Sequence, residues 1–408
     1  MKFNKWTIGL AAVGVVSLAS AVQAEEKPSS VMTAVSSTTL SGYVDTSAQW
    51  NLGGGHSHTP GYAYNTASKA NGFNLNVAKL SLEKVADAAD AWGAGYKVDA
   101  LFGPNANAVG GLGTQSPGTF GTSSDFALKQ AYVDLKAPVG NGLDFKMGVF
   151  DTIIGYEVFD AGSNPNFTRS YGYTIEPTTH TGLLATYQVA EAVSLSGGVA
   201  ETFGPSINQR AFLAGNKAQS YKTYLGSLAL TAPKDWGFVA GSTLYGGVIN
   251  GFNGGNAADQ TSFYAGASLN TPVKELKVGA SYDYVAVGNN GTQKSGYQNA
   301  TGVYGTFQVS EKFSLNLRGE YFSQSGYLAN LYNNANGGLF GATGTVLPKE
   351  AIEGTLTAQY DLWKNVISRV ELRWDHATSG HPFGGETAAA LGHEKNSFEL
   401  IGNVIYKF

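Results

Sequence analysis

The C-terminal segment of this chain, from Glu394 to Phe408, alternates between apolar and polar side chains. One face carries Phe398, Leu400, Gly402, Val404, Tyr406 and Phe408, and the other is filled largely by Ser397, Glu399, Asn403 and Lys407. Successive side chains point to opposite faces only in a β-strand. A strand of this length with one apolar face, one polar face and a terminal aromatic residue is typical of a barrel wall between lipid and water. The pattern therefore predicts a membrane barrel that encloses a pore.

The N-terminus has the pattern of an export signal. Lys2 and Lys5 precede an apolar run, and a small-residue cleavage pattern ends at Ala24. We predict a signal peptide over residues 1–24 and a short periplasmic segment over residues 25–37. The later sequence contains no run of the ~20 consecutive apolar residues that a membrane-spanning helix needs. Strands must therefore carry any membrane insertion.

Composition limits the function classes. The chain has no cysteine, which excludes disulfides and a lipid-modified cysteine anchor. Only 14% of the residues are charged, whereas the 408 residues include 54 Gly, 22 Tyr and 21 Phe, a balance that favours sheets and turns. The formal charge of -4 becomes more negative once the two signal-peptide lysines are removed, so no basic patch indicates nucleic acid as a partner. No cofactor is expected.

Alternating segments bounded by Gly, Pro, Asn and Ser recur along the whole chain. They predict an all-β fold, a single antiparallel transmembrane β-barrel of about 16 strands over residues 38–408. The expected strands are 38–50, 72–84, 91–103, 126–137, 142–150, 177–189, 191–202, 218–231, 237–250, 261–271, 273–287, 297–309, 311–324, 349–361, 364–376 and 395–408.

The predicted connections alternate between long and short. The long ones include 51–71, 104–125, 151–176, 203–217, 325–348 and 377–394, and the short ones include 138–141, 232–236 and 362–363, with tight turns near Glu191, Pro272 and Ser310. A barrel inserted from one side keeps short periplasmic turns on one rim and long extracellular loops on the other. An even strand number places both chain ends on the short-turn rim.

The charged residues of the last strands indicate which face looks inward. Arg369 and Arg373 share one face of their predicted strand, opposite Val370 and Leu372. A shift of one residue would turn both arginines toward lipid, at a cost of roughly 2–4 kcal/mol each near the midplane. The same argument turns the charged faces of the two preceding strands toward the lumen.

Two predicted strands do not alternate cleanly. In 126–137, Lys129 shares a face with Val133 and Leu135, and 72–84 is equally ambiguous. A β-bulge, which inserts one extra residue, would reconcile the two halves of such a strand. No pore residue is assigned from either strand.

The tryptophans provide an independent indication. Trp92, Trp236 and Trp363 fall beside predicted short turns, whereas Trp50 and Trp374 fall where strands enter long loops. Indole rings prefer the membrane interface, so two aromatic girdles are expected. The alternative is that these are core aromatic residues of a soluble sheet protein.

The central sequence is similar to a known family. Residues 129–189 read KQAYVDLKAPVGNGLDFKMGVFDTIIGYEVFDAGSNPNFTRSYGYTIEPTTHTGLLATYQV, and fragments such as GYVDTSAQWNL at 42–52 and STLYGGVINGF at 242–252 extend the similarity over most of the mature chain. This text resembles the OmpL-like outer-membrane β-barrel porins. The resemblance implies a passive channel for small hydrophilic solutes in the bacterial outer membrane, and it implies no specific substrate.

The long connection over residues 151–176 is the candidate constriction. General porins fold the loop at this topological position into the lumen, and we expect the same here by analogy. Its charged residues are Asp151, Glu157, Asp160 and Glu176 against the single base Arg169. A folded-in loop would place net negative charge in the narrow water path, which predicts a mild cation preference. Alternatively, these acids lie on an outward, solvated loop with Arg169 paired locally.

The inward faces of the strands are expected to supply the lumen wall. The candidate wall residues are Lys146, Arg318, Glu320, Arg369, Glu371, Arg373 and Asp375. Because this set contains both signs of charge, the wall by itself predicts weak selectivity. Solvation and pairing between strands explain most of these residues without a functional role.

Histidines at two places in the chain are weak indications of a metal site or a catalytic site. His56 and His58 offer two imidazoles, but an exposed loop with no nearby carboxylate or cysteine favours a polar loop, and no metal site is predicted. His180 lies among threonines and is the best starting point for a catalytic site, yet a lone histidine of this kind is more often a hydrogen-bonded wall residue. We therefore predict no enzymatic activity.

The sequence as a whole predicts an outer-membrane porin, surrounded by outer-membrane lipid, for the passive diffusion of small hydrophilic solutes and ions. One alternative is a barrel with a loop-plugged lumen that acts in adhesion or surface binding, and a more remote one is an outer-membrane hydrolase. A homotrimer is expected by analogy with porins of this strand number. A Gly-rich face made of Gly241, Thr243, Tyr245, Gly247 and Ile249 is expected to face lipid and to permit contact between subunits.

Overall fold

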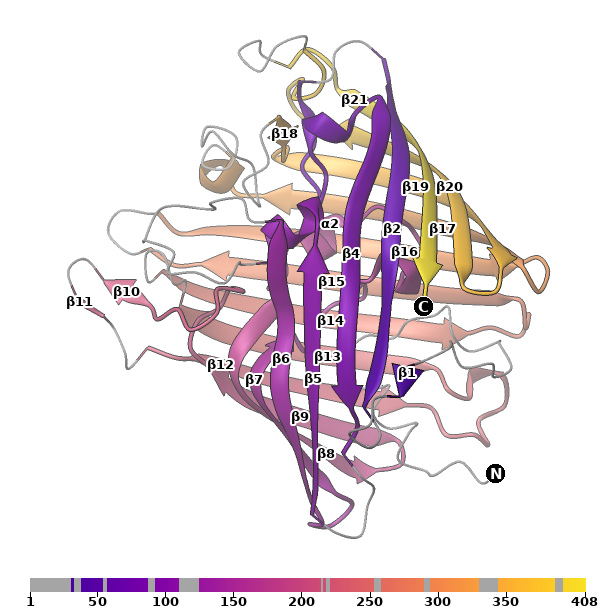
Figure 1. Ribbon diagram of the computed structural model, residues 1–408. Helices are drawn as coiled ribbons and strands as arrows, with labels where there is room; N and C mark the ends of the chain where they lie inside the picture. Colours follow the sequence, from indigo (N-terminus) through magenta and orange to yellow (C-terminus); the bar gives the residue numbers. More distant parts are fainter. Residues whose placement is uncertain are drawn as a thin grey trace.

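The wall of the molecule is one closed antiparallel barrel of sixteen long strands (Figure 1). The computed structural model describes residues 31–32, 38–53, 57–86, 92–109, 125–213, 216–217, 221–252, 258–289, 294–329, 344–385 and 392–408. The all-β fold class and the strand number predicted from the sequence are confirmed.

The wall strands follow one another around the barrel in chain order. They are β2 Thr39–Leu52, β4 Gly72–Lys84, β5 Gly93–Phe102, β6 Phe126–Ala137, β7 Leu143–Asp151, β8 Thr179–Ala190, β9 Val193–Ala200, β12 Thr223–Thr231, β13 Thr243–Phe252, β14 Asp259–Asn270, β15 Leu276–Val287, β16 Gly296–Gln308, β17 Phe313–Gln324, β19 Glu350–Trp363, β20 Val366–Ala377 and β21 Asn396–Lys407.

The remaining elements are short. The strands are β1 Val31–Met32, β3 Thr59–Pro60, β10 Phe212–Leu213, β11 Asn216–Lys217 and β18 Thr345–Val346, and the helices are η3 Ala67–Lys69, η4 Pro104–Ala108, η5 Ala161–Ser163, α2 Tyr171–Ile175 and η6 Gly237–Val239. No helix in the described part of the chain is long and apolar enough to cross a membrane.

The barrel closes where its first long strand meets its last. β2 pairs with β4 on one side and with β21 on the other, from Tyr43 opposite Lys407 to Leu52 opposite Phe398. The main chains of Gly42 and Phe408 also exchange two hydrogen bonds of 3.0 Å. Because closure pairs both edges, the wall presents no unpaired ladder to another chain.

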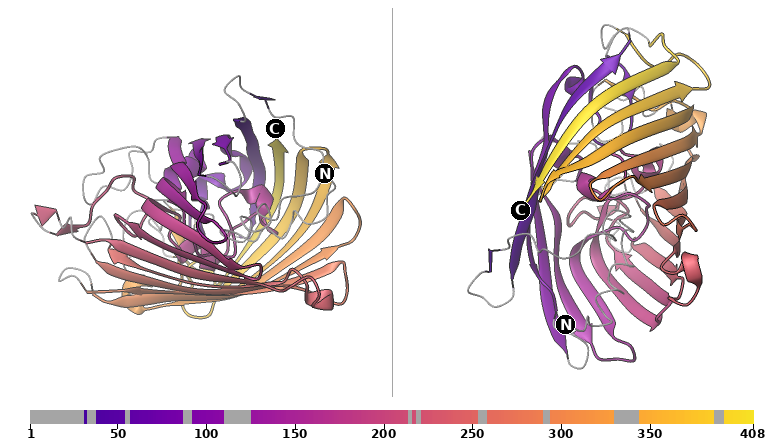
Figure 2. Two further views of the ribbon diagram at one scale, coloured as in Figure 1. Left: turned by 90° about the horizontal axis from the view of Figure 1, so that it is seen from below. Right: turned by 90° about the vertical axis from the view of Figure 1, so that its right-hand side faces the viewer.

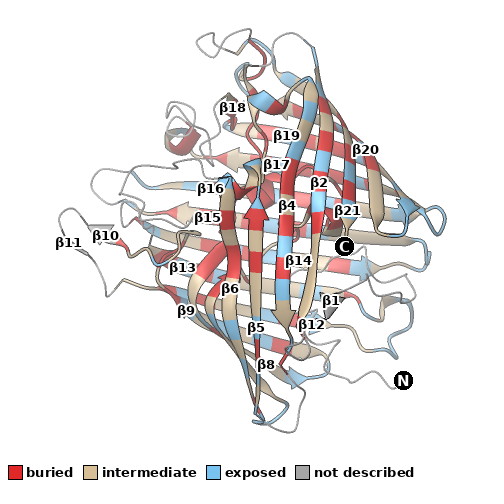
Figure 3. Ribbon diagram, in the orientation of Figure 1, coloured by how far each residue is buried: buried red, intermediate tan, exposed pale blue. Residues whose placement is uncertain are grey.

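Along the wall strands, buried and exposed residues alternate, as the banding in Figure 3 shows. Exposed apolar side chains form the outer face, and buried polar side chains lie on the inner face. Leu317 and Val370 are 56% and 59% exposed on the outside. Arg318, Arg369 and Arg373 are buried on the other side, at 2%, 2% and 0% exposure. The cost of placing an arginine in lipid predicted this strand register from the sequence, and the structure has the same register.

Two β-bulges explain the strands whose alternation was ambiguous. In the pairing of β5 with β6, Asp99 lies opposite Gln130 and Ala100 opposite Leu128, which leaves Lys129 as the extra residue. The bulge expected in 126–137 is therefore confirmed. β4 has the same irregularity at Asn76, which is skipped in its pairing with β2. Each extra residue moves the alternation by one position, so Lys129 lies on the inside of the barrel.

Exposed tryptophans mark both ends of the barrel. Trp92, Trp236 and Trp363 are 77%, 61% and 69% exposed on the short-turn rim, and Trp50 is 43% exposed near the long-loop end. Trp374, at the same end as Trp50, is partly buried. These are the positions expected of two interfacial girdles.

The face assigned from the sequence to strand β13 is wrong. Ile249 is fully buried, and the hydroxyl of Tyr245 donates a hydrogen bond to the carbonyl of Ile153 inside the barrel. The outward residues are Leu244 and Val248, at 52% and 39% exposure. Both faces of β13 are apolar, because its lumen side packs against protein rather than water, so alternation alone does not decide the register.

A charge placed on the outer face tests this orientation. We expect Leu317→Arg to destabilise the barrel by roughly 2–4 kcal/mol, because it puts a guanidinium into hydrocarbon. Thr186→Arg is the control, since Thr186 lies on the inner face of β8 and bonds Ser196 of β9. Urea unfolding in lipid vesicles would measure both variants. Equal losses of stability would contradict the assignment of faces.

Candidate pore and the segment inside it

A long connection runs inside the barrel rather than over its rim. We call residues 152–178, which join β7 to β8, the inner segment. It contains η5 and α2, and Figures 1 and 2 show it within the curve of the wall strands. None of its residues is exposed, and most are buried. The inner segment includes all the constriction candidates except Asp151, which ends β7 directly before it.

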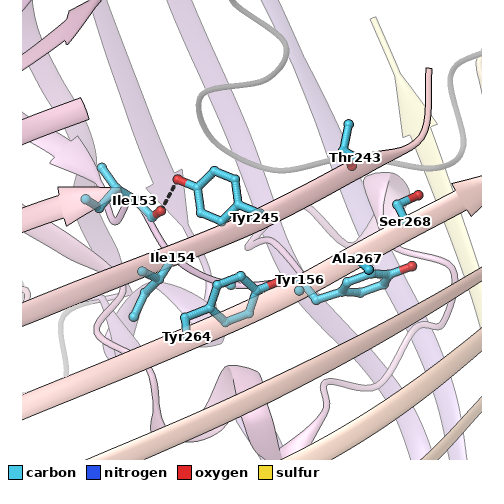
Figure 4. A pocket seen from close by; sticks show the side chains of 10 residues that line it. Ile153, Ile154, Tyr156, Thr243, Tyr245, Tyr264, Ala267 and Ser268 are labelled. Carbon is cyan, nitrogen blue, oxygen red and sulfur yellow. Dashed lines mark hydrogen bonds between the residues drawn. The ribbon is translucent and has the colours of Figure 1, made fainter. Parts of the chain in front are cut away.

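One side of the inner segment is apolar. Ile153, Ile154 and Tyr156 form a buried cluster with inward side chains of the wall, among them Leu225 and Ile249. Figure 4 shows Ile153 and Ile154 beside Tyr245 and Tyr264, with the Tyr245 hydroxyl bonded to Ile153. The β8–β14 part of the wall is therefore covered by protein and does not need a polar inner face.

The other side of the inner segment is held by the arginines of the opposite wall. Each arginine donates to main-chain carbonyls of the segment: Arg318 to Thr168 at 2.6 Å, Arg369 to Ala161 at 2.8 Å and to Asn164 at 2.9 Å, and Arg373 to Arg169 at 2.7 Å. Hydrogen bonds from a charged donor are among the stronger ones in proteins. The wall arginines predicted from the sequence thus act as anchors for the segment.

The wall carboxylates bind the main-chain amides of the same segment. Glu371 accepts from the amides of Phe167 and Thr168 at 2.6 and 2.9 Å. Glu320 accepts from the amides at the start of α2, those of Tyr171 and Gly172, at 2.9 and 3.2 Å. Asp375 accepts from the Tyr171 hydroxyl at 2.8 Å. Acids and bases of the wall therefore satisfy backbone groups that would otherwise be buried without partners.

Arg318 is the centre of a buried ion-pair network. Its guanidinium lies 2.9 Å from Glu157, 3.1 Å from Glu353 and 3.6 Å from Glu320, and none of the four side chains is more than 1% exposed. Arg373 forms a second centre, with two 2.8 Å bonds to Asp375. Burial strengthens these attractions but makes the loss of any partner costly.

The four acids expected in the constriction lie in two environments. Glu157 and Glu176 are buried. The side chains of Asp151 and Asp160 remain 36% and 32% exposed, although Lys129 and Lys79 approach them at 2.5 and 2.8 Å and are themselves only 5% and 8% exposed. The carboxylates of these pairs are therefore more accessible to water than the ammonium groups.

The charge of Asp160 is fixed by its neighbours. Its partial burial opposes ionisation, but the ammonium groups of Lys79 and Lys129 outweigh this effect and lower the pKa of Asp160 to about 2. The Tyr43 hydroxyl also donates to its carboxylate at 3.0 Å. Asp160 is therefore a permanent carboxylate at neutral pH.

Arg169 is buried and does not lie on an outward loop. It donates to the carbonyls of Phe159 and Phe167 at 2.5 and 2.6 Å, and its guanidinium lies 5.5 and 5.6 Å from the ring centroids of Tyr64 and Tyr173. The arginine thus braces the inner segment through carbonyls and aromatic faces.

Lys146, the remaining wall candidate, stands apart from the arginines. It is partly buried, and its ammonium group lies 5.1 Å from the ring centroid of Tyr132 on the neighbouring strand β6. The structure therefore brings together six of the seven wall candidates around the inner segment and leaves Lys146 separate.

The connection between β2 and β4 also contacts the interior of the barrel, and the sequence did not predict this. The Tyr62 hydroxyl donates to Glu399 at 2.7 Å, and the amide of Ala63 donates to the Thr174 hydroxyl of α2 at 2.9 Å. The only available signal was the position of Glu399 on the polar face of the C-terminal strand. The lysines Lys79 and Lys129 were also missed, because Lys129 is the extra residue of the β6 bulge and Lys79 follows the β4 bulge at Asn76, where the alternation is disturbed.

The histidines noted in the sequence have ordinary structural contacts. His180 is fully buried, with Nε2 3.1 Å from the Thr152 hydroxyl. His58 Nδ1 lies 3.0 Å from the Gly384 carbonyl, while His56 falls outside the described residues. Within the described ranges no group of three His, Cys, Asp or Glu side chains is arranged to hold a metal ion.

Solved outer-membrane proteins share this barrel. The outer-membrane channel DcaP of Acinetobacter baumannii matches with a TM-score of 0.55 and 11% identity, covering 91% of this chain and 97% of that one. An anion-selective porin from Comamonas acidovorans matches with a TM-score of 0.56 and 14% identity, over 91% and 99%. OmpT of Vibrio cholerae matches with a TM-score of 0.53 and 14% identity, over 93% and 100%. At these identities the likeness shows the fold alone.

The family assignment comes from the sequence itself. A search of curated proteins found no match. The model of one protein family, described as "Putative beta-barrel porin-2, OmpL-like", matches residues 37–408, nearly the whole chain. Together with the closed sixteen-stranded wall, this match shows that the chain belongs to the OmpL-like family of outer-membrane β-barrel porins.

Proposed function

We propose that this porin-like barrel conducts small hydrophilic solutes and ions by passive diffusion through the outer membrane. The observation that carries the proposal is the position of the inner segment, which crosses the lumen and is bonded to the inner face of the wall from Ala161 to Gly172. About sixteen strands enclose a lumen too wide for wall side chains to fill. An inner segment then sets the width and charge of what remains.

Planar-bilayer conductance combined with liposome swelling in a series of neutral sugars tests this proposal. A conducting protein with a cutoff in sugar size is the expected result. Protein that inserts but neither conducts nor admits sugars would overturn it, and would favour the alternative of a plugged barrel that acts in surface binding. The dense contacts of the inner segment are the observation that keeps this alternative open.

We also propose a mild cation preference, carried by Asp151 and Asp160. These carboxylates are about one-third exposed, while their lysine partners are buried. Fixed charge next to a confined water path selects ions by sign. Glu157 and Glu176, which the sequence grouped with them, are too buried to contribute in the same way.

Neutralising the exposed acids tests this preference. The double variant Asp151→Asn and Asp160→Asn should move the reversal potential in a salt gradient toward anion permeation, because it removes the two water-facing carboxylates. Asp235→Asn is the matched control, since Asp235 is exposed on the short-turn rim. An unchanged reversal potential in the double variant, or an equal shift in the control, would contradict the assignment.

Export and assembly are further parts of the proposal. We propose that residues 1–24 are removed as a signal peptide, which N-terminal sequencing of the outer-membrane protein would test. We propose a homotrimer, because a trimer form is known for OmpT of Vibrio cholerae, one of the structural neighbours. Crosslinking in mild detergent should give a trimer, and a monomer throughout would contradict it.

A further inference from the structure

The buried carboxyl groups around α2 outnumber the bases. Glu176 at the end of α2 and Asp283 on β15 are both buried, and their carboxyl groups are hydrogen-bonded to each other. Two carboxylates cannot form such a bond without a proton between them, because an ionised carboxylate only accepts. This contact therefore holds at least one proton.

The charged groups around the pair further favour its protonated form. The charged groups that act on Glu176 most strongly after Asp283 are Glu157 and Glu320, which are also acidic. The titratable groups that act on the pair are Glu157 of the inner segment, Tyr264 of β14 and Glu320 of β17. Next to these groups lie Tyr156 of the inner segment, Tyr304 of β16, Arg318 of β17 and Glu353 of β19. Arg318 is the single cation of this group, and its contacts are already with Glu157, Glu320 and Glu353.

The pair lacks a donor from the surrounding protein. Glu176 Oε1 and Asp283 Oδ1 are buried with no donor in the described part of the chain that forms a hydrogen bond to either oxygen. A buried carboxylate without a donor or a cation is strongly disfavoured. The contact is thus stable in its protonated form and unstable once both groups ionise.

We propose that the Glu176–Asp283 pair is a proton-operated latch, which holds the α2 end of the inner segment against the wall and releases it as the pH rises. α2 packs on the inner faces of β15 and β16, where Tyr171 and Ile175 join a buried cluster with Val285 and Ala300. Loss of the shared proton to water leaves two negative charges in contact, and separation of the segment from β15 relieves them.

The direction of the pH dependence follows from proton binding. Burial, and after it the charge of Asp283, raise the pKa of Glu176 well above its ordinary value near 4.5. The docked segment therefore binds a proton that the undocked segment has lost, at every pH between the ordinary and the raised pKa. Docking is strongest at low pH, and each proton released changes the docked-to-undocked ratio by up to about tenfold per pH unit in this window.

Thiol labelling measures the latch without relying on conduction. The chain has no cysteine, so Ile175→Cys introduces a single thiol at a buried position of α2. Asp235→Cys, on the exposed short-turn rim, corrects for the intrinsic pH dependence of the thiol reaction. The maleimide labelling rate of residue 175 relative to residue 235 should rise by about tenfold or more from pH 6 to pH 8.5.

Isosteric variants show whether the pair is responsible. Glu176→Gln keeps a hydrogen-bond donor toward Asp283 but cannot ionise, so it should hold the change in relative labelling below about twofold over the same pH range. Asp283→Asn should reduce the pH dependence of labelling in the same way. It serves as the test variant if Glu176→Gln does not fold. Glu83→Gln, which alters a lumen carboxylate paired with Lys97, should retain the dependence. Labelling independent of pH, or a dependence that both amide variants retain, would overturn the latch.

A conductance measurement, which rests on the proposed function, distinguishes the latch from the channel. If the barrel is a channel, the wild-type protein should conduct better at pH 8.5 than at pH 6, and Glu176→Gln should conduct alike at both. pH-dependent labelling without conductance at any pH supports the latch and counts against the channel. Conductance together with labelling that does not respond to pH counts against the latch alone.

Discussion

Replacing residues 154–176 with two glycines is expected to increase single-channel conductance several-fold. The variant removes nearly all of the inner segment, and a barrel of this strand number leaves an aqueous lumen once no loop fills it. The wall can close without the segment, because Asp151 already lies opposite Thr179 and the amide of Thr152 donates to the Thr178 carbonyl at 3.0 Å. A four-residue turn would join the two strands.

Planar-bilayer recordings would measure this gain, and liposome swelling should show entry of larger sugars. Heat-modifiable mobility on gels establishes that the variant still folds as a barrel. The control inserts two glycines between Lys234 and Asp235 on the short-turn rim, which changes a connection without changing the lumen. A folded variant with wild-type conductance would show that ions pass without meeting the inner segment.

Arg318→Met is expected to weaken docking of the inner segment by about 3–5 kcal/mol, the usual cost of removing one partner from a buried ion-pair network. The substitution leaves Glu157, Glu320 and Glu353 buried without their guanidinium, and it also removes the bond to the Thr168 carbonyl. Hydrogen exchange of the segment amides measures the docking equilibrium directly, and larger fluctuations in channel current should accompany faster exchange.

The matched control is Arg210→Met. Arg210 pairs with Glu201 at 3.0 Å, but the two side chains are 38% and 24% exposed, so this pair should contribute only ~0–1 kcal/mol. Adding Glu157→Gln and Glu353→Gln to Arg318→Met should restore part of the loss, because it removes two of the three uncompensated charges. An effect of Arg318→Met no larger than that of Arg210→Met would contradict the role of Arg318 as an anchor.

Much of the wall could be predicted because membrane strands encode it locally. Leu317 and Arg318 are adjacent, and the difference between hydrocarbon and water assigns them to opposite faces whatever the rest of the chain does. Where that difference disappears, prediction fails. In β13 the lumen side packs on Ile153 and Ile154, so Tyr245 and Ile249 read as a lipid face although they point inward.

The candidate site was predictable as a set of residues but not as an arrangement. The charged side chains near the lumen could be named from the alternation of polar residues, but their partners could not. Arg318 and Thr168 are 150 positions apart in the chain, and no periodic pattern links an arginine of the wall to a particular carbonyl of a loop. Lys79 and Lys129 were hidden for a related reason, since the bulge near each is a property of strand pairing.

The sequence by itself determined the closed barrel, its strand order, its two rims and the inward direction of its arginines, because the cost of polar groups in lipid acts on each residue separately. Only the tertiary structure decided that these arginines bind the inner segment, that Glu157 and Glu176 are buried while Asp151 and Asp160 meet water, and that Glu176 contacts Asp283. Those outcomes depend on how one loop packs inside the wall, and packing between distant segments is a collective property that no local pattern contains.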